Sequence, residues 1–221
     1  MPFSPLPGPF LDEAGALALR PHVAVDLGCG AGDFAAVLAG AGLGVIGLDR
    51  SRPLPADRPA VLGDVLCPPL APGSCDLLIA ANLVRHLVPR RRDLAFLTGW
   101  TGLLRPGGAL YVFEDEPRGG PGPAGNYGRL QALLAKVAPD VRGPLLGRDV
   151  FMQKAAALRL RVTESGTWNN TWPLDARAVL TMLASGRPEP GGDVARLMRA
   201  IGRDGIACGP AWWARLQPEE E

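Results

Sequence analysis

The sequence predicts an α/β fold with a doubly wound sheet of about seven strands, mostly parallel, whose last strand is antiparallel. Two observations support this prediction. Short apolar runs alternate with helical patterns through the first half of the chain, which is typical of parallel strands joined by crossover helices. The first apolar run also ends in a glycine-rich turn that opens into a helix.

The first elements follow from apolar spacing. A helix at 9–19 leads into a strand at 22–27, and three glycines at alternate positions separate this strand from a helix at 31–41. The next strand is expected at 44–49. Three prolines then fall within 51–59, so the crossover helix usual at this point is reduced to a loop.

Two short apolar strands come next, at 60–64 and 75–81. A helix is expected at 89–104, with a proline at its start. The Pro-Gly-Gly that follows stops this helix before a strand at 109–114. Residues 116–125 are rich in Gly and Pro and are predicted to form a loop.

The second half of the chain begins with two helices and ends with a strand. Helical spacing recurs four times and strand spacing twice, which predicts helices at 126–138, 147–159, 174–184 and 193–201 and strands at 160–167 and 206–216. The last strand returns without a crossover and is therefore expected to be antiparallel. The two helices before it form an insertion at the edge of the sheet, where specificity usually lies.

The glycine turn carries the chemistry. Glycine has no Cβ, so a ligand can lie against the bare backbone of Gly28, Gly30 and Gly32 at the start of a helix. A dinucleotide site prefers the spacing G-x-G-x-x-G. Counted from Gly28, the last glycine of that pattern would fall at position 33, but this chain has Asp33 there, which would repel a pyrophosphate. The turn therefore favours a cationic nucleoside ligand.

The stretch Asp26-Leu27-Gly28-Cys29-Gly30-Ala31-Gly32 resembles the D-x-G-x-G-x-G motif of class I S-adenosylmethionine-dependent methyltransferases. With the later strands, the resemblance covers about residues 22–115. It implies a Rossmann-like fold, S-adenosyl-L-methionine as cofactor, and methyl transfer by in-line attack on the sulfonium methyl. The cofactor residues that it implies are Asp26, Gly28, Cys29, Gly30, Gly32, Asp49, Arg50, Asp64, Val65 and Asn82.

Two of these residues have expected partners. Asp49 lies about 20 residues after Gly28, the spacing at which an acidic residue binds ribose hydroxyls. The resemblance implies that Asp64 contacts the adenine amino group. Each aspartate alone could equally be a strand-end cap, because Asp favours turns and helix starts.

Three residues are candidates for catalysis. His86 matches the second of two adjacent histidines in many relatives, while Arg85 takes the place of the first; His86 is expected either to cap the turn or to face the acceptor. Glu114 and Asp115 end a predicted strand at the same sheet edge. They are expected either to orient or deprotonate an acceptor or to form a solvated acidic loop.

Two tryptophans are candidate walls for the acceptor. Trp168 and Trp172 stand beside two asparagines, and they are expected either to wall an acceptor pocket or to lie in the core. The pair Trp212 and Trp213 falls in the predicted last strand, where alternation sends one ring to each face of the sheet.

Composition limits the partners. The chain has 23 Lys and Arg residues against 22 Asp and Glu, so no large basic field attracts nucleic acid or an anionic membrane. We therefore expect a small-molecule acceptor. Four scattered cysteines and two histidines predict no metal site, and the N-terminal residues do not resemble a signal peptide, which suggests the cytoplasm. The oligomeric state is left open.

The domain prediction is a single methyltransferase-like domain over residues 1–221. It consists of an N-terminal helical cap at 1–20, a cofactor-binding half at 22–115, and a substrate-side half at 116–221 with the insertion at about 174–201. Two alternatives remain open: a non-catalytic module that binds S-adenosylmethionine or S-adenosylhomocysteine, and a nicotinamide-dependent oxidoreductase.

Overall fold

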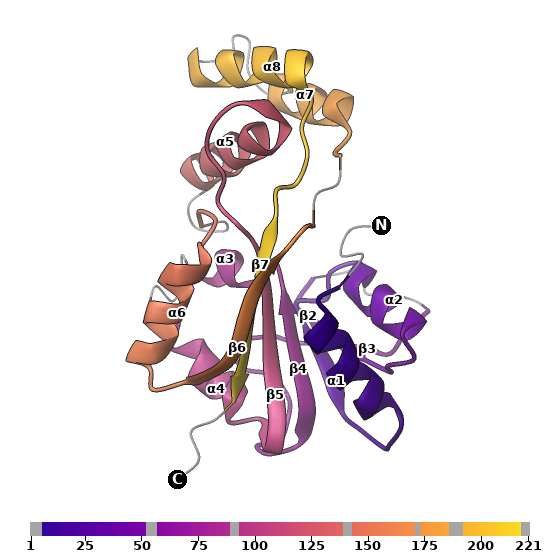
Figure 1. The fold of residues 1–221 in the computed structure, drawn as a ribbon. Helices are drawn as coiled ribbons and strands as arrows, with labels where there is room; N and C mark the ends of the chain where they lie inside the picture. The colour runs from indigo at the N-terminus through magenta and orange to yellow at the C-terminus, as the bar shows by residue number, and fades with distance from the viewer. Residues whose placement is uncertain are drawn as a thin grey trace.

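A computed structural model gives the fold, and it describes residues 6–51, 57–88, 93–138, 143–170, 173–185 and 192–217. Its centre is a seven-stranded sheet in the order β3-β2-β1-β4-β5-β7-β6 (Figure 1). The strands are β1 (Ala24–Leu27), β2 (Ile46–Asp49), β3 (Ala60–Leu62), β4 (Cys75–Ala81), β5 (Leu104–Asp115), β6 (Arg161–Trp168) and β7 (Ala211–Gln217). β7 runs antiparallel to both of its neighbours, and the other paired strands run parallel. The predicted fold class is confirmed.

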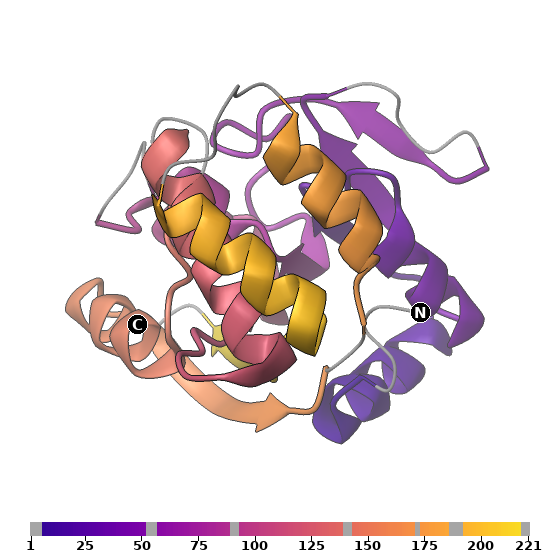
Figure 2. The same cartoon turned by 90° about the horizontal axis from the view of Figure 1, so that it is seen from above.

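The described helices form two layers and a cover. They are α1 (Gly8–Ala18), α2 (Asp33–Gly40), α3 (Val84–Leu87), α4 (Phe96–Thr101), α5 (Gly122–Val137), α6 (Arg148–Ala157), α7 (Ala176–Ala184) and α8 (Gly192–Asp204). α1 and α2 lie on one face of the sheet and α4 and α6 on the other (Figure 1). α5, α7 and α8 stand over the carboxyl ends of the parallel strands and are called here the helical cover (Figures 1 and 2).

The alternation of β7 builds both cores. Trp212 packs with the α4 and α6 layer and Trp213 with the α1 and α2 layer. Both rings are buried, and the Trp212 Nε1–H donates to the Leu146 carbonyl oxygen at 2.8 Å. The prediction that one ring goes to each face is confirmed.

Several elements differ in extent from the prediction. α5 begins at Gly122, inside the loop expected at 116–125, and the strand expected from 206 begins at Ala211. The helix expected at 89–104 is wrong in extent: the structure has α3 and then α4, and residues 89–92 lie outside the described residues. Leu94 has φ +58°, a left-handed conformation that a regular right-handed helix cannot include. The strand expected to begin at 109 begins at Leu104, because the Pro-Gly-Gly forms a bulge within β5 and does not end the pairing with β4.

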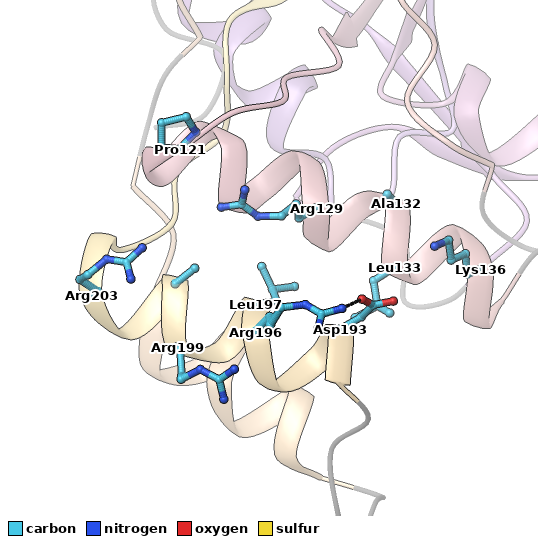
Figure 3. Close-up of a pocket in the computed structure, with 11 residues that line it drawn as sticks. Pro121, Arg129, Ala132, Leu133, Lys136, Asp193, Arg196, Leu197, Arg199 and Arg203 are labelled. Carbon is cyan, nitrogen blue, oxygen red and sulfur yellow. Dashed lines mark hydrogen bonds and ion pairs between the residues drawn. The ribbon is translucent and has the colours of Figure 1, made fainter.

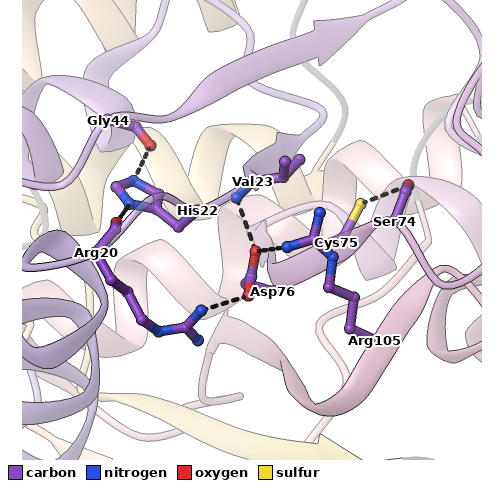
Figure 4. A network of polar contacts seen from close by, with 8 residues as sticks. All are labelled: Arg20, His22, Val23, Gly44, Ser74, Cys75, Asp76 and Arg105. Atoms are coloured by element: carbon purple, nitrogen blue, oxygen red, sulfur yellow. Dashed lines mark hydrogen bonds and ion pairs between the residues drawn. The ribbon is translucent and has the colours of Figure 1, made fainter.

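The amino end of the sheet is held by Asp76. Its carboxylate accepts hydrogen bonds from the Val23 backbone N–H at 2.9 Å, from Arg20 at 3.0 Å and from Arg105 at 2.9 Å (Figure 4). Desolvation acts to raise the pKa of Asp76, but these donors outweigh it and lower the pKa. His22 lies in the same network, against the carbonyl oxygens of Arg20 and Gly44. This histidine is therefore engaged at the amino end of the sheet.

Within the described ranges, no helix is long and apolar enough to cross a membrane.

Candidate functional site

The turn between β1 and α2 is a bare backbone cradle. Gly28, Gly30 and Gly32 all have positive φ, at +71°, +50° and +85°. A Cβ on Gly28 would lie 2.6 Å from Leu83 Cδ1, so this position has no room for a side chain. A Cβ on Gly30 would have no atom within 4 Å, so the backbone there faces open space where a ligand can lie.

Asp49 fixes this cradle. One of its oxygens accepts from the Gly30 backbone N–H at 2.9 Å, and the other accepts from the Ser51 backbone N–H at 2.8 Å. A carboxylate has about four acceptor positions, so Asp49 keeps capacity for further donors. The end of β2 thus both shapes the glycine turn and offers acceptors beside it.

A cavity of about 290 Å³ opens at these strand ends. Its lining includes six of the ten residues expected to bind the cofactor and one of the expected catalytic residues. The lining residues are Gly28, Asp49, Arg50, Ser51, Asp64, Val65, Asn82, Leu83, His86 and Leu87. Strands that end at one edge of the sheet bring these separate segments together.

Four expected cofactor residues lie outside the lining. Gly30 and Gly32 belong to the turn itself, and Asp26 is buried beneath it at the end of β1. The Cys29 side chain points into the sheet, since a Cβ on Gly47 would lie 2.6 Å from its sulfur. Burial and then the charge of Asp26 raise the pKa of the Cys29 thiol to about 11, so this side chain stays a neutral thiol.

The sequence missed Ser51, Leu83 and Leu87 as lining residues. Ser51 comes two residues after Asp49, and its backbone N–H donates to the Asp49 carboxylate. The aspartate at the end of the strand was therefore the sequence feature from which Ser51 could have been predicted. Leu83 and Leu87 lie beyond β4 and look like ordinary core leucines in the sequence, so no signal marked them.

Two buried acceptors lack partners near the cradle. Asp26 Oδ2 and Asn82 Oδ1 have no hydrogen-bond donor among the described residues. Burial and then the charge of Asp49 raise the pKa of Asp26 to about 7. Asn82 has φ +53°, and its backbone N–H donates to the Phe113 carbonyl oxygen at 2.7 Å, which fixes it at the end of β4. A ligand with a donor group such as an ammonium fits this pair of acceptors.

Asp64 and His86 both reach the cavity from strand ends. One oxygen of Asp64 accepts from the Leu66 backbone N–H at 2.9 Å, so this residue caps a turn as well as lining the cavity. His86 is half-buried on α3, and its backbone N–H donates to the Leu83 carbonyl oxygen. Its position in the lining leaves both a turn-capping and an acceptor-facing role open to it.

The acidic end of β5 is buried, and the expectation of a solvated loop is wrong for Glu114 and Asp115. Their exposed fractions are 1% and 2%. Asp115 Oδ2 accepts from Arg85 Nη1 at 2.8 Å and from the Tyr127 hydroxyl at 2.6 Å. Glu114 Oε1 accepts from the Arg85 backbone N–H at 3.3 Å, and Glu114 Oε2 is buried without a partner among the described residues. One arginine therefore faces two buried carboxyl groups.

The charges in this cluster are unequal. Desolvation acts to lower the pKa of Arg85, but the nearby Glu114, Tyr127 and Asp115 outweigh it, and the net shift is upward. Burial raises the pKa of Glu114 to about 7, against the lowering effect of Arg85. Arg85 pairs directly with Asp115, and Glu114 is a buried carboxyl whose raised pKa lets it keep its proton to higher pH than an exposed glutamate does.

We expect Glu114 to make stability depend on pH. Its folded pKa lies above the ordinary value of 4.5, so the folded chain binds more protons in this window and stability falls as pH rises toward 7. The wild type should lose about 2 kcal/mol of unfolding free energy through this group between about pH 5 and pH 8. Glu114→Gln should lose less, because glutamine does not ionise.

Urea unfolding at both pH values measures this difference. The pKa of Asp26 is also raised to about 7, but Asp26 is present in both proteins, so the comparison isolates Glu114. Equal changes with pH in the two proteins would contradict the assignment.

Trp168 lies close to the same edge. Its half-buried ring meets Phe113 edge-on, with centroids 5.6 Å apart, and Phe113 in turn accepts from the Asn82 backbone N–H. Trp168 Nε1 is buried without a partner among the described residues. Trp172 lies outside the described residues.

The fold and the cavity at the strand ends are typical of α/β proteins that bind a nucleoside cofactor. The family model described as "Methyltransferase domain" matches residues 25–112. The tRNA (carboxymethyluridine(34)-5-O)-methyltransferase ALKBH8 of Macaca fascicularis is 34% identical over 101 residues, which are 42% of this chain and 15% of that protein. The chain thus spans less than a fifth of that relative's length.

Two solved structures show the same fold. The cyclopropane-fatty-acyl-phospholipid synthase-like protein from Lactobacillus casei has a TM-score of 0.64 at 19% identity, over 94% of this chain and 88% of its own. Geranyl diphosphate C-methyltransferase from Streptomyces coelicolor, in complex with Mg²⁺, geranyl diphosphate and S-adenosyl-L-homocysteine, has a TM-score of 0.52 at 15% identity, over 96% and 78%.

Residues 25–112 thus match a methyltransferase domain, and the chain shares the fold of class I S-adenosylmethionine-dependent methyltransferases, as its motif predicted. S-adenosyl-L-methionine is the cofactor of these methyltransferases, and the glycine cradle and the unpartnered Asn82 oxygen in the cavity lining fit it. The nicotinamide interpretation finds no support in these comparisons.

Proposed function

We propose that the protein transfers the methyl group of S-adenosylmethionine to a small-molecule acceptor. The observation that carries the acceptor class is the helical cover, which stands over the carboxyl end of the sheet where the cofactor cavity opens (Figure 2). In this proposal the acceptor approaches the cavity from the end of the sheet on which the cover stands. This geometry favours a compact acceptor, and the near-balance of charge in the chain points the same way.

The lining residues supply the contacts that the cofactor needs. In the proposal, Asp49 accepts from the ribose hydroxyls, Asp64 accepts from the adenine amino group, and Asp26 and Asn82 accept from the ammonium group. Arg50 and Val65 complete the walls of the nucleoside part. When bound, the cofactor supplies a methyl group already activated by a sulfonium, so the chain's task is chiefly alignment of the acceptor.

His86 is the side chain that we propose to hold a proton of the acceptor, because it lines the cavity at the end of β4. Asp115 serves as a positioning residue in this proposal. It binds Arg85, the neighbour of His86 on α3, and Tyr127 on α5 of the cover. The cluster thereby ties the cavity wall to the helices above it.

Methyl-labelled S-adenosylmethionine tests the proposal. We expect the purified protein, given a small-molecule extract and separately a tRNA pool, to place label in the small-molecule fraction alone. Label in tRNA, the substrate class in the name of the ALKBH8 relative, would overturn the acceptor class. Tight binding of S-adenosylhomocysteine without any transfer would support the non-catalytic alternative.

The four free thiols agree with the cytoplasm as the proposed compartment.

Trp168 gives a second, residue-level test of the acceptor side. Trp168→Phe keeps an aromatic ring against Phe113 but removes the unpartnered N–H. We expect kcat/KM for the labelled acceptor to fall roughly tenfold, the loss of one hydrogen bond. Affinity for S-adenosylhomocysteine, measured by calorimetry, should stay near wild type. Equal losses of cofactor and acceptor binding, with a lower Tm, would mean that Trp168 is a core residue.

A further inference from the structure

A second cavity lies between α5 and α8, away from the strand ends that hold the cofactor cavity. It measures about 640 Å³, within the range of small-molecule sites. Five cationic side chains and a single carboxylate belong to its lining. The lining residues are Pro121, Arg129, Ala132, Leu133, Lys136, Asp193, Arg196, Leu197, Arg199, Ala200 and Arg203. This cavity is called here the α5–α8 groove (Figure 3).

Helix geometry explains why the cations gather there. Arg129 and Lys136 are seven residues apart on α5, and Arg196 and Arg203 are seven apart on α8, so each pair spans two turns, or about 10 Å. The apolar stripe of α8 packs on α5, which brings the two basic stripes along the same seam. A chain with a net charge of only +1 thus concentrates positive charge in one groove.

Part of this charge is available to a ligand. Within the described part of the chain, Lys136 and Arg199 form no ion pair, whereas Arg196 pairs with Asp193 and Arg203 with Asp204. Both arginines and Asp193 are exposed, and ion pairs at the surface are weak, so these arginines exchange readily for a stronger anion. Leu133 and Leu197 give the groove an apolar floor between the two basic stripes.

We propose that the α5–α8 groove binds a small organic ligand that carries two or more phosphate groups. Phosphate oxygens match arginine and lysine donors, and the apolar floor accommodates the organic part. Asp193 and Asp204 stand at the two ends of the α8 stripe, where they would repel a backbone that continued past the groove. The groove therefore suits a short polyphosphate better than an RNA strand.

Calorimetric titration with inorganic tripolyphosphate tests the site. We expect binding that weakens with added salt. Arg196→Glu on one wall and Lys136→Glu on the other should each weaken it roughly tenfold or more, because each replaces an attractive charge with a repulsive one. Arg177→Glu is the matched control: it makes the same change of charge on α7, outside the groove, and should leave the affinity unchanged.

Three results would overturn the proposal. The first is a wild-type chain that does not bind tripolyphosphate, and the second is an equal loss in all three variants. The third is a single-stranded RNA oligonucleotide that binds with sensitivity to Arg196→Glu while tripolyphosphate does not compete with it. The groove variants should bind S-adenosylhomocysteine as the wild type does, so this outcome is independent of the proposed methyl transfer.

Discussion

Replacing Asp115 by alanine should lower the free energy of unfolding by about 3–5 kcal/mol. The substitution removes the carboxylate that accepts from Arg85 at 2.8 Å and from the Tyr127 hydroxyl at 2.6 Å, all three residues being buried. The guanidinium would then face only Glu114, whose raised pKa of about 7 leaves it only partly ionised near neutral pH. Urea unfolding near neutral pH measures the loss, with the midpoint and the slope compared with wild type.

Two controls separate buried charge from the mere loss of a side chain. Asp204→Ala removes the partner of the solvent-exposed Arg203, and the unfolding midpoint should stay unchanged. Arg85→Met combined with Asp115→Leu removes both charges and should recover much of the stability lost by Asp115→Ala. An unfolding midpoint for Asp115→Ala equal to that of Asp204→Ala would contradict the buried cluster.

The acidic end of β5 shows where the sequence stops being informative. Three consecutive carboxylates after a strand are typical of a solvated loop. The burial of Glu114 and Asp115 depends on Arg85, some thirty residues earlier, and on Tyr127, one helix later. The third residue of the run, Glu116, is half-buried and accepts from the Arg148 backbone N–H at the start of α6. The packing of the helical cover, a contact between segments distant in the sequence, buries the first two carboxyl groups, and no local sequence pattern predicts that packing.

The glycine turn and the strand ends could be predicted because their signals are local. A glycine that must adopt positive φ and an aspartate that ends a strand can each be recognised from about a dozen neighbouring residues. The residues around the cavity at Gly28 and Asp49 could therefore be predicted from the sequence. The α5–α8 groove could not be predicted, because its walls come from helices about seventy residues apart in the sequence. Each basic stripe alone looks like an ordinary solvated helix face.

Replacing Asp49 by alanine should weaken S-adenosylhomocysteine binding by roughly tenfold to a few hundredfold. The lower figure corresponds to the loss of one hydrogen bond to a charged acceptor, and the higher figure to the loss of two. The geometry adds a second cause. Asp49 also accepts from the Gly30 backbone N–H at 2.9 Å, so the alanine variant loosens the glycine cradle as well as losing the proposed ribose contact.

A comparison of variants distinguishes the two causes. Asp49→Asn keeps an acceptor oxygen that can hold Gly30 but has one acceptor fewer for the ribose, so its affinity should fall between wild type and Asp49→Ala. Asp64→Ala leaves the glycine cradle intact and measures only the proposed contact to the adenine amino group. Calorimetry measures each affinity, and circular dichroism checks that each variant is folded. A folded Asp49→Ala variant with wild-type affinity would remove Asp49 from the cofactor site, and with it the strongest link between the second strand and the cofactor.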